Sequence, residues 1–184
     1  IKSAKKLTMG SLCSKFEKNF SKFIKNKYSI FVNSGSSANL LALSSLTSHT
    51  IKKDRRIMQG DEIITCAAGF PTTVSPIIQN KCVPVFLDNN PETGNIKTEM
   101  LQEAFVEGKT KAVMIAHTLG NPFDLSEILN FCKSNNLWLI EDNCDSLGST
   151  YTMKKDNFEQ LNINKFIEEN EYGYKKLTGS WGDI

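Results

Sequence analysis

The sequence predicts an α/β fold in which helices cover a mostly parallel sheet. Short apolar runs alternate along the chain with longer segments whose apolar residues recur at helical spacing. The short runs are apolar throughout, which is typical of strands that are buried on both faces of a parallel sheet. Because ligands bind at the carboxyl ends of the strands in such sheets, the turns that follow these runs are candidate site segments.

The first half of the chain contains three predicted strands and three predicted helices. Apolar residues recur on one stripe along residues 12–24, which predicts the first helix. A Gly/Pro turn begins at Gly69, and we expect a short helix after it whose start is limited by Pro76. In chain order the elements are a helix over 12–24, a strand over 28–33, a helix over 37–46, a strand over 61–66, the turn and helix within 69–80, and a strand over 82–88.

The second half continues the alternation. Residues 89–95 are a polar cluster with Pro and Gly, which predicts a turn. Asp124 is expected to cap the helix that follows it. The predicted elements are a helix over 97–106, a strand over 111–117, a helix over 125–135 and a strand over 137–142.

Residues 152–174 interrupt this rhythm. They are rich in Asn, Lys and Glu, and their apolar residues are too sparse to predict a core element. We interpret them as a surface excursion with a transient helix around 158–169. Lengthening a connection adds little closure entropy, so an inserted segment of this kind is tolerated.

Length and composition narrow the classes of protein. A chain of 184 residues suits one domain, and its net charge of +2 comes from scattered lysines, so nucleic acid is not expected as a partner. No apolar run is long enough to span a bilayer, so no membrane partner is expected either. Five cysteines without a C-x-x-C pair indicate reduced thiols and a cytoplasmic protein. The chain opens on Ile1 and stops where another strand would begin, and we expect it to be a piece of a longer protein.

The stretch "NSGSSANLLAL" (33–43) places Ser34, Gly35, Ser36 and Ser37 at the predicted start of a helix. Such a turn directs free backbone N–H groups and the positive helix end at one point, which suits a phosphate. Gly35 would let the backbone approach the ligand, and Ser36 and Ser37 would add hydroxyl donors. The same residues equally suit a glycine turn with a serine cap, so this stretch alone leaves both interpretations open.

Asp142 ends the strand predicted over 137–142, where an apolar strand meets the expected cleft. A buried carboxylate needs a partner, and the protonated ring nitrogen of pyridoxal phosphate would serve as one. A strand-end Asp that caps a neighbouring backbone turn is the alternative interpretation.

Other strand-end residues are weaker candidates. Phe70 would stack on a flat cofactor ring or pack against the next helix. His117 suits acid–base chemistry or a structural hydrogen bond. Asp145 and Cys144 follow Asp142 closely. The sequence contains no zinc-ligand spacing and no G-x-S-x-G nucleophile elbow, so no metal site is expected.

Together these stretches resemble the DegT/DnrJ/EryC1/StrS family of pyridoxal-phosphate-dependent sugar aminotransferases. The segments that carry the resemblance are "NSGSSANLLAL", "GDEIITCAAGFPTTVSPIIQN", "PVFLD", "AHTLGNPFDL", "LWLIEDNCDSLGSTY" and "KLTGSWGDI". Within the family, "EDNCDSLG" is similar to the nucleotide-sugar 3-dehydrase branch, which includes CDP-4-keto-6-deoxyglucose 3-dehydrase.

The resemblance implies the fold type I architecture of pyridoxal-phosphate-dependent transferases. Residues 1–184 would be the N-terminal part of the large cofactor-binding domain, with 152–175 a surface insertion and the small domain outside this stretch. By position, Gly35, Ser36 and Ser37 would hold the cofactor phosphate. Phe70 would stack on the pyridine ring, Asp142 would pair with its nitrogen, and Asp145 would lie near its phenolic oxygen.

The implied activity is 3-dehydration of a 4-keto-6-deoxy sugar nucleotide with pyridoxamine 5'-phosphate, in deoxysugar biosynthesis. A sugar aminotransferase and an inert cofactor-site fragment are the alternatives, and the catalytic base, Lys or His, is expected beyond Ile184. The family implies a homodimer. One subgroup carries an iron–sulfur cluster with a ligand at the position of Cys144. The sequence leaves that cluster and a reductase partner open, and we interpret Cys144 as an ordinary thiol.

Overall fold

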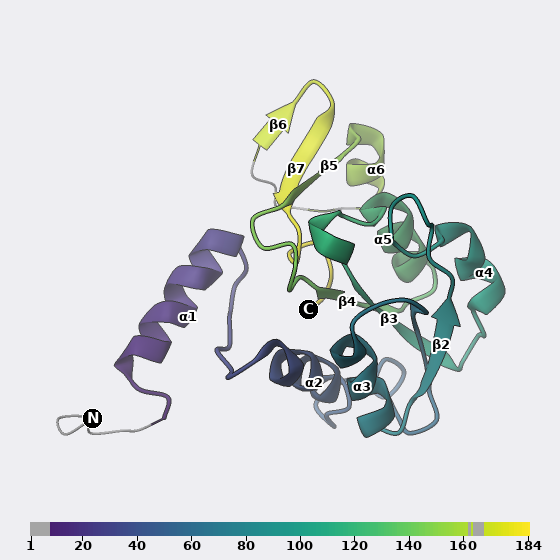
Figure 1. Ribbon diagram of the computed structural model, residues 1–184, viewed down its shortest axis with the longest axis horizontal. Coiled ribbons are helices and arrows are strands. Elements are labelled where there is room, and N and C mark those ends of the chain that lie inside the picture. The colour runs from purple at the N-terminus through teal and green to yellow at the C-terminus, as the bar shows by residue number, and fades with distance from the viewer. Residues whose placement is uncertain (1–7, 162, 164–167) are drawn as a thin grey trace.

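The computed structural model describes residues 8–161, 163 and 168–184. A four-stranded sheet lies at the centre, α2 and α3 lie on one side of it and α5 on the other, and α1 stands apart (Figure 1). The strands are β1 (Glu62–Cys66), β2 (Val83–Leu87), β3 (Thr110–Ala116) and β4 (Trp138–Asp142). They are ordered β2-β1-β3-β4, and every neighbouring pair is parallel. The predicted parallel sheet is therefore confirmed.

Two apolar layers cover the two faces of the sheet. Because side chains alternate along a strand, β4 directs Leu139 to one face and Ile140 to the other. Leu139 packs with α4 (Leu101–Ala104) and α5 (Leu125–Ser134), whereas Ile140 packs with α2 (Gly35–Ser45) and α3 (Pro71–Gln79). The same alternation sends Glu141 and Asp142 to opposite faces.

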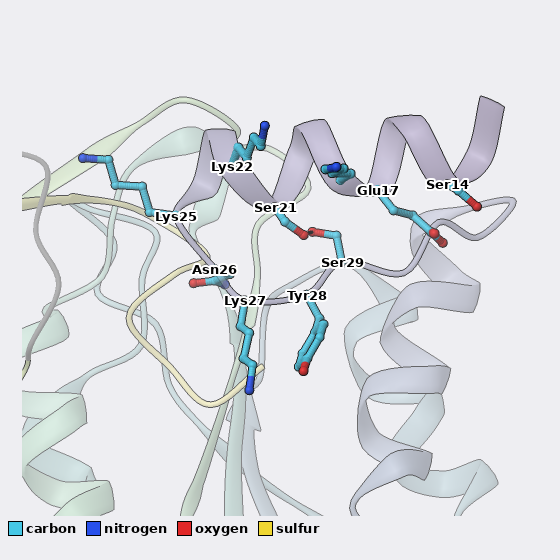
Figure 2. A pocket seen from close by; sticks show the side chains of 10 residues that line it. Ser14, Glu17, Ser21, Lys22, Lys25, Asn26, Lys27, Tyr28 and Ser29 are labelled. Carbon is cyan, nitrogen blue, oxygen red and sulfur yellow. Dashed lines mark hydrogen bonds between the residues drawn. The ribbon is translucent and has the colours of Figure 1, made fainter. Parts of the chain in front are cut away.

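The prediction of a strand over residues 28–33 is wrong. These residues form no strand, and they connect α1 (Ser11–Ile24) to α2. They contact α1 instead: Phe31 packs edge-on against Phe16, with 5.0 Å between ring centroids, and its N–H donates to Glu17. Figure 2 shows Ser21 of α1 and Ser29 of this linker pointing toward one another, and their hydroxyls are 2.9 Å apart. The apolar and β-branched residues suit a strand, but no neighbouring strand pairs with them here.

Two helices differ from the prediction at their ends. The helix α3 begins at Pro71, and Pro76 lies inside it, so Pro76 does not limit its start. Proline is favoured in the first helical turn, where its missing N–H costs no hydrogen bond, so Pro71 suits this start. The helix expected over 97–106 is shorter, a 3-10 turn η1 (Thr98–Met100) followed by α4. Asp124 caps α5 through Glu127 N–H, as predicted.

The interpretation of 152–174 as a surface excursion is corrected. A second, antiparallel sheet forms there from β5 (Thr150–Met153), β7 (Gly173–Leu177) and β6 (Glu168–Asn170), in the order β5-β7-β6. The helix α6 (Lys155–Gln160) starts earlier than expected and ends at Gln160. Of the rest of the helix expected around 158–169, residues 161 and 163 are not helical, 168–169 belong to β6, and 162 and 164–167 lie outside the described residues. The buried side chains of Met153, Phe158 and Leu161 join the core layer of α5. A few well-placed apolar residues are enough to anchor this segment.

The last residues lie along the free edge of β4. Ile184 N–H donates to Leu139 O at 3.3 Å, and Glu141 N–H donates to Ile184 O at 2.8 Å, which is the pattern of a parallel neighbour. Within the described part of the chain, no helix combines the length and the apolar character needed to cross a bilayer.

Candidate functional site

The carboxylate of Asp142 lies buried at the carboxyl end of β4. Its Oδ2 accepts hydrogen bonds from Asn39 Nδ2 at 2.8 Å and from Thr73 Oγ1 at 2.7 Å. Its Oδ1 accepts one from the backbone N–H of Cys144 at 3.2 Å. The turn-capping interpretation of Asp142 therefore applies to Oδ1, which accepts from the turn after β4. Oδ2 instead accepts from side chains of two helices, α2 and α3.

The surroundings of Asp142 leave room for one more donor. No ion pair to this carboxylate occurs among residues 8–161, 163 and 168–184. A carboxylate oxygen accepts about two hydrogen bonds, so Oδ2 is saturated and Oδ1 keeps one free acceptor position. A buried anion held only by neutral donors is matched by an incoming cationic N–H group. A protonated pyridine nitrogen fits this requirement.

The start of α2 lies on the same cavity. A cavity of about 660 Å³ is lined by Ser34, Gly35, Asn39 and Asp142, together with apolar side chains of α1 and of the linker. Ser34 is the N-cap of α2, and its hydroxyl accepts from Ser37 N–H at 3.2 Å. The N–H groups of Gly35 and Ser36 precede the first intrahelical hydrogen bond and are available to a ligand. Both interpretations of this turn, cap and anion site, are therefore compatible with the structure.

The remaining predicted site residues lie around this centre but outside the cavity lining. Ser36 is exposed and Ser37 half-buried in the first turn of α2. Phe70 is the N-cap of α3, with 70 % of its surface exposed, and lines a small adjoining pocket with Thr73. The backbone N–H of Thr73 donates to Phe70 O, so Phe70 precedes by one helical turn the threonine whose hydroxyl contacts Asp142. Asp145 is exposed in the turn after β4.

His117 has a structural environment. It is fully buried, its ring stacks on Phe123 with centroids 4.1 Å apart, and its Nε2 lies 2.9 Å from Glu141 Oε2. Glu141 also accepts backbone N–H groups from Gly179 at 2.9 Å and from Trp181 at 2.7 Å. The side chains of His117 and Glu141 lie on the face of the sheet opposite Asp142. Through these hydrogen bonds Glu141 holds the segment 179–182 against β4.

Three residues of this region were not singled out from the sequence. Asn39 and Thr73 hold Asp142, and Glu141 binds the segment after β7. The available signals were weak: Asn39 is a polar residue within the aliphatic "ANLLAL", and Glu141 precedes Asp142 in a strand whose side chains alternate.

The thiols divide by burial. Burial raises the pKa of the Cys66 and Cys82 thiols to about 11 each, and it also raises that of Cys132. Cys144 is the exposed cysteine next to the site, and it lines the cavity. Within the described residues, no group of three or more His, Cys, Asp or Glu side chains is arranged to hold a metal ion.

Comparison with known proteins points to one family. The sequence profile of the DegT/DnrJ/EryC1/StrS aminotransferase family matches residues 1–161. The lipopolysaccharide biosynthesis protein RfbH of Salmonella typhimurium is 52% identical over 145 residues, which are 79% of this chain and 33% of RfbH. The dTDP-4-dehydro-2,6-dideoxy-D-glucose 3-dehydratase of Saccharopolyspora spinosa is 49% identical over 146 residues, 79% of this chain and 31% of that enzyme. The GDP-perosamine synthase of Escherichia coli O157:H7 is 32% identical over 145 residues, 79% of this chain and 37% of the synthase.

A solved structure shares both fold and sequence with the chain. The E. coli GDP-4-keto-6-deoxy-D-mannose-3-dehydratase with bound hydrated PLP superposes with a TM-score of 0.70 at 37% identity, over 80% of this chain and 36% of that one. The predicted fold of a pyridoxal-phosphate-dependent transferase is therefore confirmed. The chain spans about a third of the length of the curated relatives that it matches.

Proposed function

The chain belongs to the DegT/DnrJ/EryC1/StrS aminotransferase family, and from this we propose that it is part of a pyridoxal-phosphate-dependent enzyme that acts on a nucleotide sugar. The reaction that we propose is 3-dehydration of a 4-keto-6-deoxy sugar nucleotide. The support for dehydration is that a 3-dehydratase is 49% identical to the chain, whereas the perosamine synthase is 32% identical.

A single observation carries the cofactor assignment. The Asp142 carboxylate is buried, is held by neutral donors, keeps one free acceptor position, and shares its cavity with the start of α2. In the bound state, pyridoxal or pyridoxamine phosphate supplies an electron sink whose protonated ring nitrogen makes it effective. Asp142 accepts the N–H of that nitrogen and stabilises its charge.

The other residues bind and orient the same group. The N–H groups of Gly35 and Ser36 and the positive end of α2 bind the phosphate, and the hydroxyls of Ser36 and Ser37 lie in the same helical turn. Phe70 at the mouth supplies an aromatic face for the ring. Asp145, in the turn after β4, is proposed to lie near the phenolic oxygen.

We propose that residues 1–184 form part of the large domain of a longer enzyme, because the matched segment is 33% of one relative and 31% of another. The homodimer expected from the family would be tested on the complete protein by light scattering.

Two variants of the complete protein test the cofactor assignment. Wild-type protein mixed with pyridoxal phosphate should give a protein-bound absorbance band, and Asp142→Ala should weaken or abolish it. Asp54→Ala changes an exposed aspartate in the loop between α2 and β1, so it is the control and should leave the band unchanged. A band of unchanged position and strength in Asp142→Ala would refute the role of Asp142.

The reaction is tested with the pyridoxamine phosphate form and 4-keto-6-deoxy sugar nucleotides that carry CDP, GDP or dTDP. Mass spectrometry should show a product that has lost its 3-hydroxyl group. The alternative, an aminotransferase, is favoured by the perosamine synthase among the relatives. It would instead give a sugar with a new amino group when glutamate is supplied, and that result would replace dehydration.

A further inference from the structure

Two buried side chains from different helices converge on one oxygen of Asp142. Asn39, in the middle of α2, and Thr73, in the first turn of α3, both donate to Oδ2. Asn39 is 8% exposed and Thr73 is 4% exposed, so neither hydrogen bond competes freely with water. The two hydrogen bonds measure 2.8 Å and 2.7 Å, which lies within the normal range for N–H···O and O–H···O hydrogen bonds.

The side chain of Asn39 is itself fixed by a feature of α3. Its Nδ2 group also donates to the carbonyl of Thr72, at 3.2 Å. In a regular helix that carbonyl accepts the N–H of residue 76, but residue 76 is proline and has no N–H. Pro76 therefore leaves an acceptor inside α3, and Asn39 bridges this acceptor to Asp142.

Donors to a carboxylate stabilise its negative charge. When a carboxylate shares a proton with a ring nitrogen, stabilising the anion favours the arrangement in which the proton stays on nitrogen. Removing a donor from Oδ2 favours the opposite arrangement, a neutral carboxylic acid beside a neutral ring.

We propose that Asn39 and Thr73 are positioning residues that keep the shared proton on the cofactor's ring nitrogen. They saturate Oδ2, stabilise the Asp142 anion and leave the free position of Oδ1 as the acceptor for the ring. This inference rests on the proposed function, because it needs a pyridine ring opposite Asp142.

The test places the proton directly. The complete protein is loaded with pyridoxal 5'-phosphate labelled with ¹⁵N in the ring, and the nitrogen chemical shift is followed with pH. A hydrogen bond to a charged group is worth enough to change the ratio of protonated to neutral ring by about ten-fold. Thr73→Val and Asn39→Leu should each move the chemical shift toward that of the neutral ring, by the amount that corresponds to a ratio of protonated to neutral ring about ten-fold lower. Thr73→Ser, which keeps the hydroxyl, should resemble wild type.

Thr110→Val is the matched control. Thr110 is also buried and hydrogen-bonded, but it begins β3 at the end of the sheet away from Asp142, so its variant should leave the shift unchanged. Thermal melts of all variants show which are folded. The two donors come from different helices, so loss of the fold in one variant still leaves the other as the test.

The outcomes separate the two proposals. The proposed function is refuted if the wild-type protein binds no cofactor. It is also refuted if the ring-nitrogen chemical shift and its pH dependence are the same in Asp142→Asn as in the wild type. A protonated ring that depends on Asp142 but is unchanged in Thr73→Val and Asn39→Leu refutes the positioning role and leaves the function standing. A shift that Thr73→Ser fails to restore also counts against the positioning role.

Discussion

Glu141 and Asp142 are adjacent acids with opposite environments. Because they point to opposite faces of β4, Glu141 meets His117 and the segment 179–182, whereas Asp142 meets α2, α3 and the cavity. Glu141 accepts from three backbone N–H groups in addition to the histidine contact, so its hydrogen-bonding capacity is filled. Only the second acid keeps an acceptor position for a ligand. We therefore propose that Asp142 has the ligand-binding role at the end of this strand, whereas Glu141 has a structural one.

We expect Glu141→Gln to destabilise the protein by about 2–4 kcal/mol, because an amide N–H₂ would face backbone N–H donors that are left unpaired in the interior. Urea unfolding measures the loss. Glu103→Gln, an exposed acid in α4, is the control and should change the free energy of unfolding by less than about 0.5 kcal/mol. A small effect at Glu141 would mean that the segment 179–182 is held by other contacts.

Gly35 allows a separate test of the anion site. A Cβ added there meets no atom within 4 Å, so the fold itself does not require glycine. We expect Gly35→Ala to keep or slightly raise the melting temperature, since alanine favours helix by about 0.5–1 kcal/mol. The affinity for pyridoxal phosphate should fall about five-fold, through a longer hydrogen bond from the backbone.

Fluorescence titration measures that affinity. Gly10→Ala, at the N-cap of α1, also meets no atom within 4 Å and should change neither quantity much. Wild-type affinity in Gly35→Ala would leave only the capping role for this turn.

The sequence was informative about which residue types end the strands, and less so about what they contact. Asp142 is a candidate from the sequence because an acid after an apolar strand needs a partner. Its donors lie 103 and 69 residues away along the chain, so no local pattern connects Asn39 and Thr73 to it. Such contacts depend on how α2 and α3 pack on the sheet.

At the scale of elements, the alternation of apolar runs and helices predicted the four parallel strands, because burial on both faces leaves a clear pattern. A similar apolar composition led to the wrong prediction of a strand at residues 28–33. A strand is stabilised by its neighbour as well as by its residues, and here the linker lies against α1. The prediction for the segment 152–174 was wrong because its composition is polar and suggested no core element. Three apolar side chains, Met153, Phe158 and Leu161, are nevertheless buried and anchor it.

Gly173 tests whether this segment is an integral part of the fold. It opens β7 with a φ of 147, and an added Cβ would collide with the backbone carbonyl of Met153 on β5. We expect Gly173→Ala to separate β5 from β7 and to lower the free energy of unfolding by more than about 2 kcal/mol.

Gly108→Ala is the matched control, because Gly108 also has a positive φ, of 80, but its Cβ would point into open space. It should cost about 1 kcal/mol, the strain of the backbone alone. Urea unfolding measures both losses of free energy. Equal losses in the two variants would mean that the pairing of β5 with β7 adds little to the stability of the fold, as expected for a surface excursion.

At the scale of the whole molecule, the described lining of the cavity beside Asp142 contains neither of the residue types, Lys and His, that the family uses as its catalytic base. Its described lining contains Glu17, Glu141, Asp142 and Asp183 but no Lys and no His, and His117 is bonded to Glu141 on the other face of the sheet. We therefore propose that the described chain contributes cofactor-binding residues to the site and that the catalytic base lies outside it. The matched segment is only 33% of one relative and 31% of another, and the rest of such a protein is where the family's Lys or His would come from.

We therefore expect the isolated 184-residue chain to turn over sugar nucleotides at least about a hundred-fold more slowly than the complete protein, because positioned acid–base catalysis is worth at least that factor. Assays of both proteins, at equal cofactor loading, measure the ratio. Borohydride reduction should trap no cofactor on a lysine of the isolated chain, since no lysine lines its described cavity. Full turnover by the isolated chain, or a trapped lysine within residues 8–184, would show that a catalytic base is already present and would overturn the division between binding and catalysis.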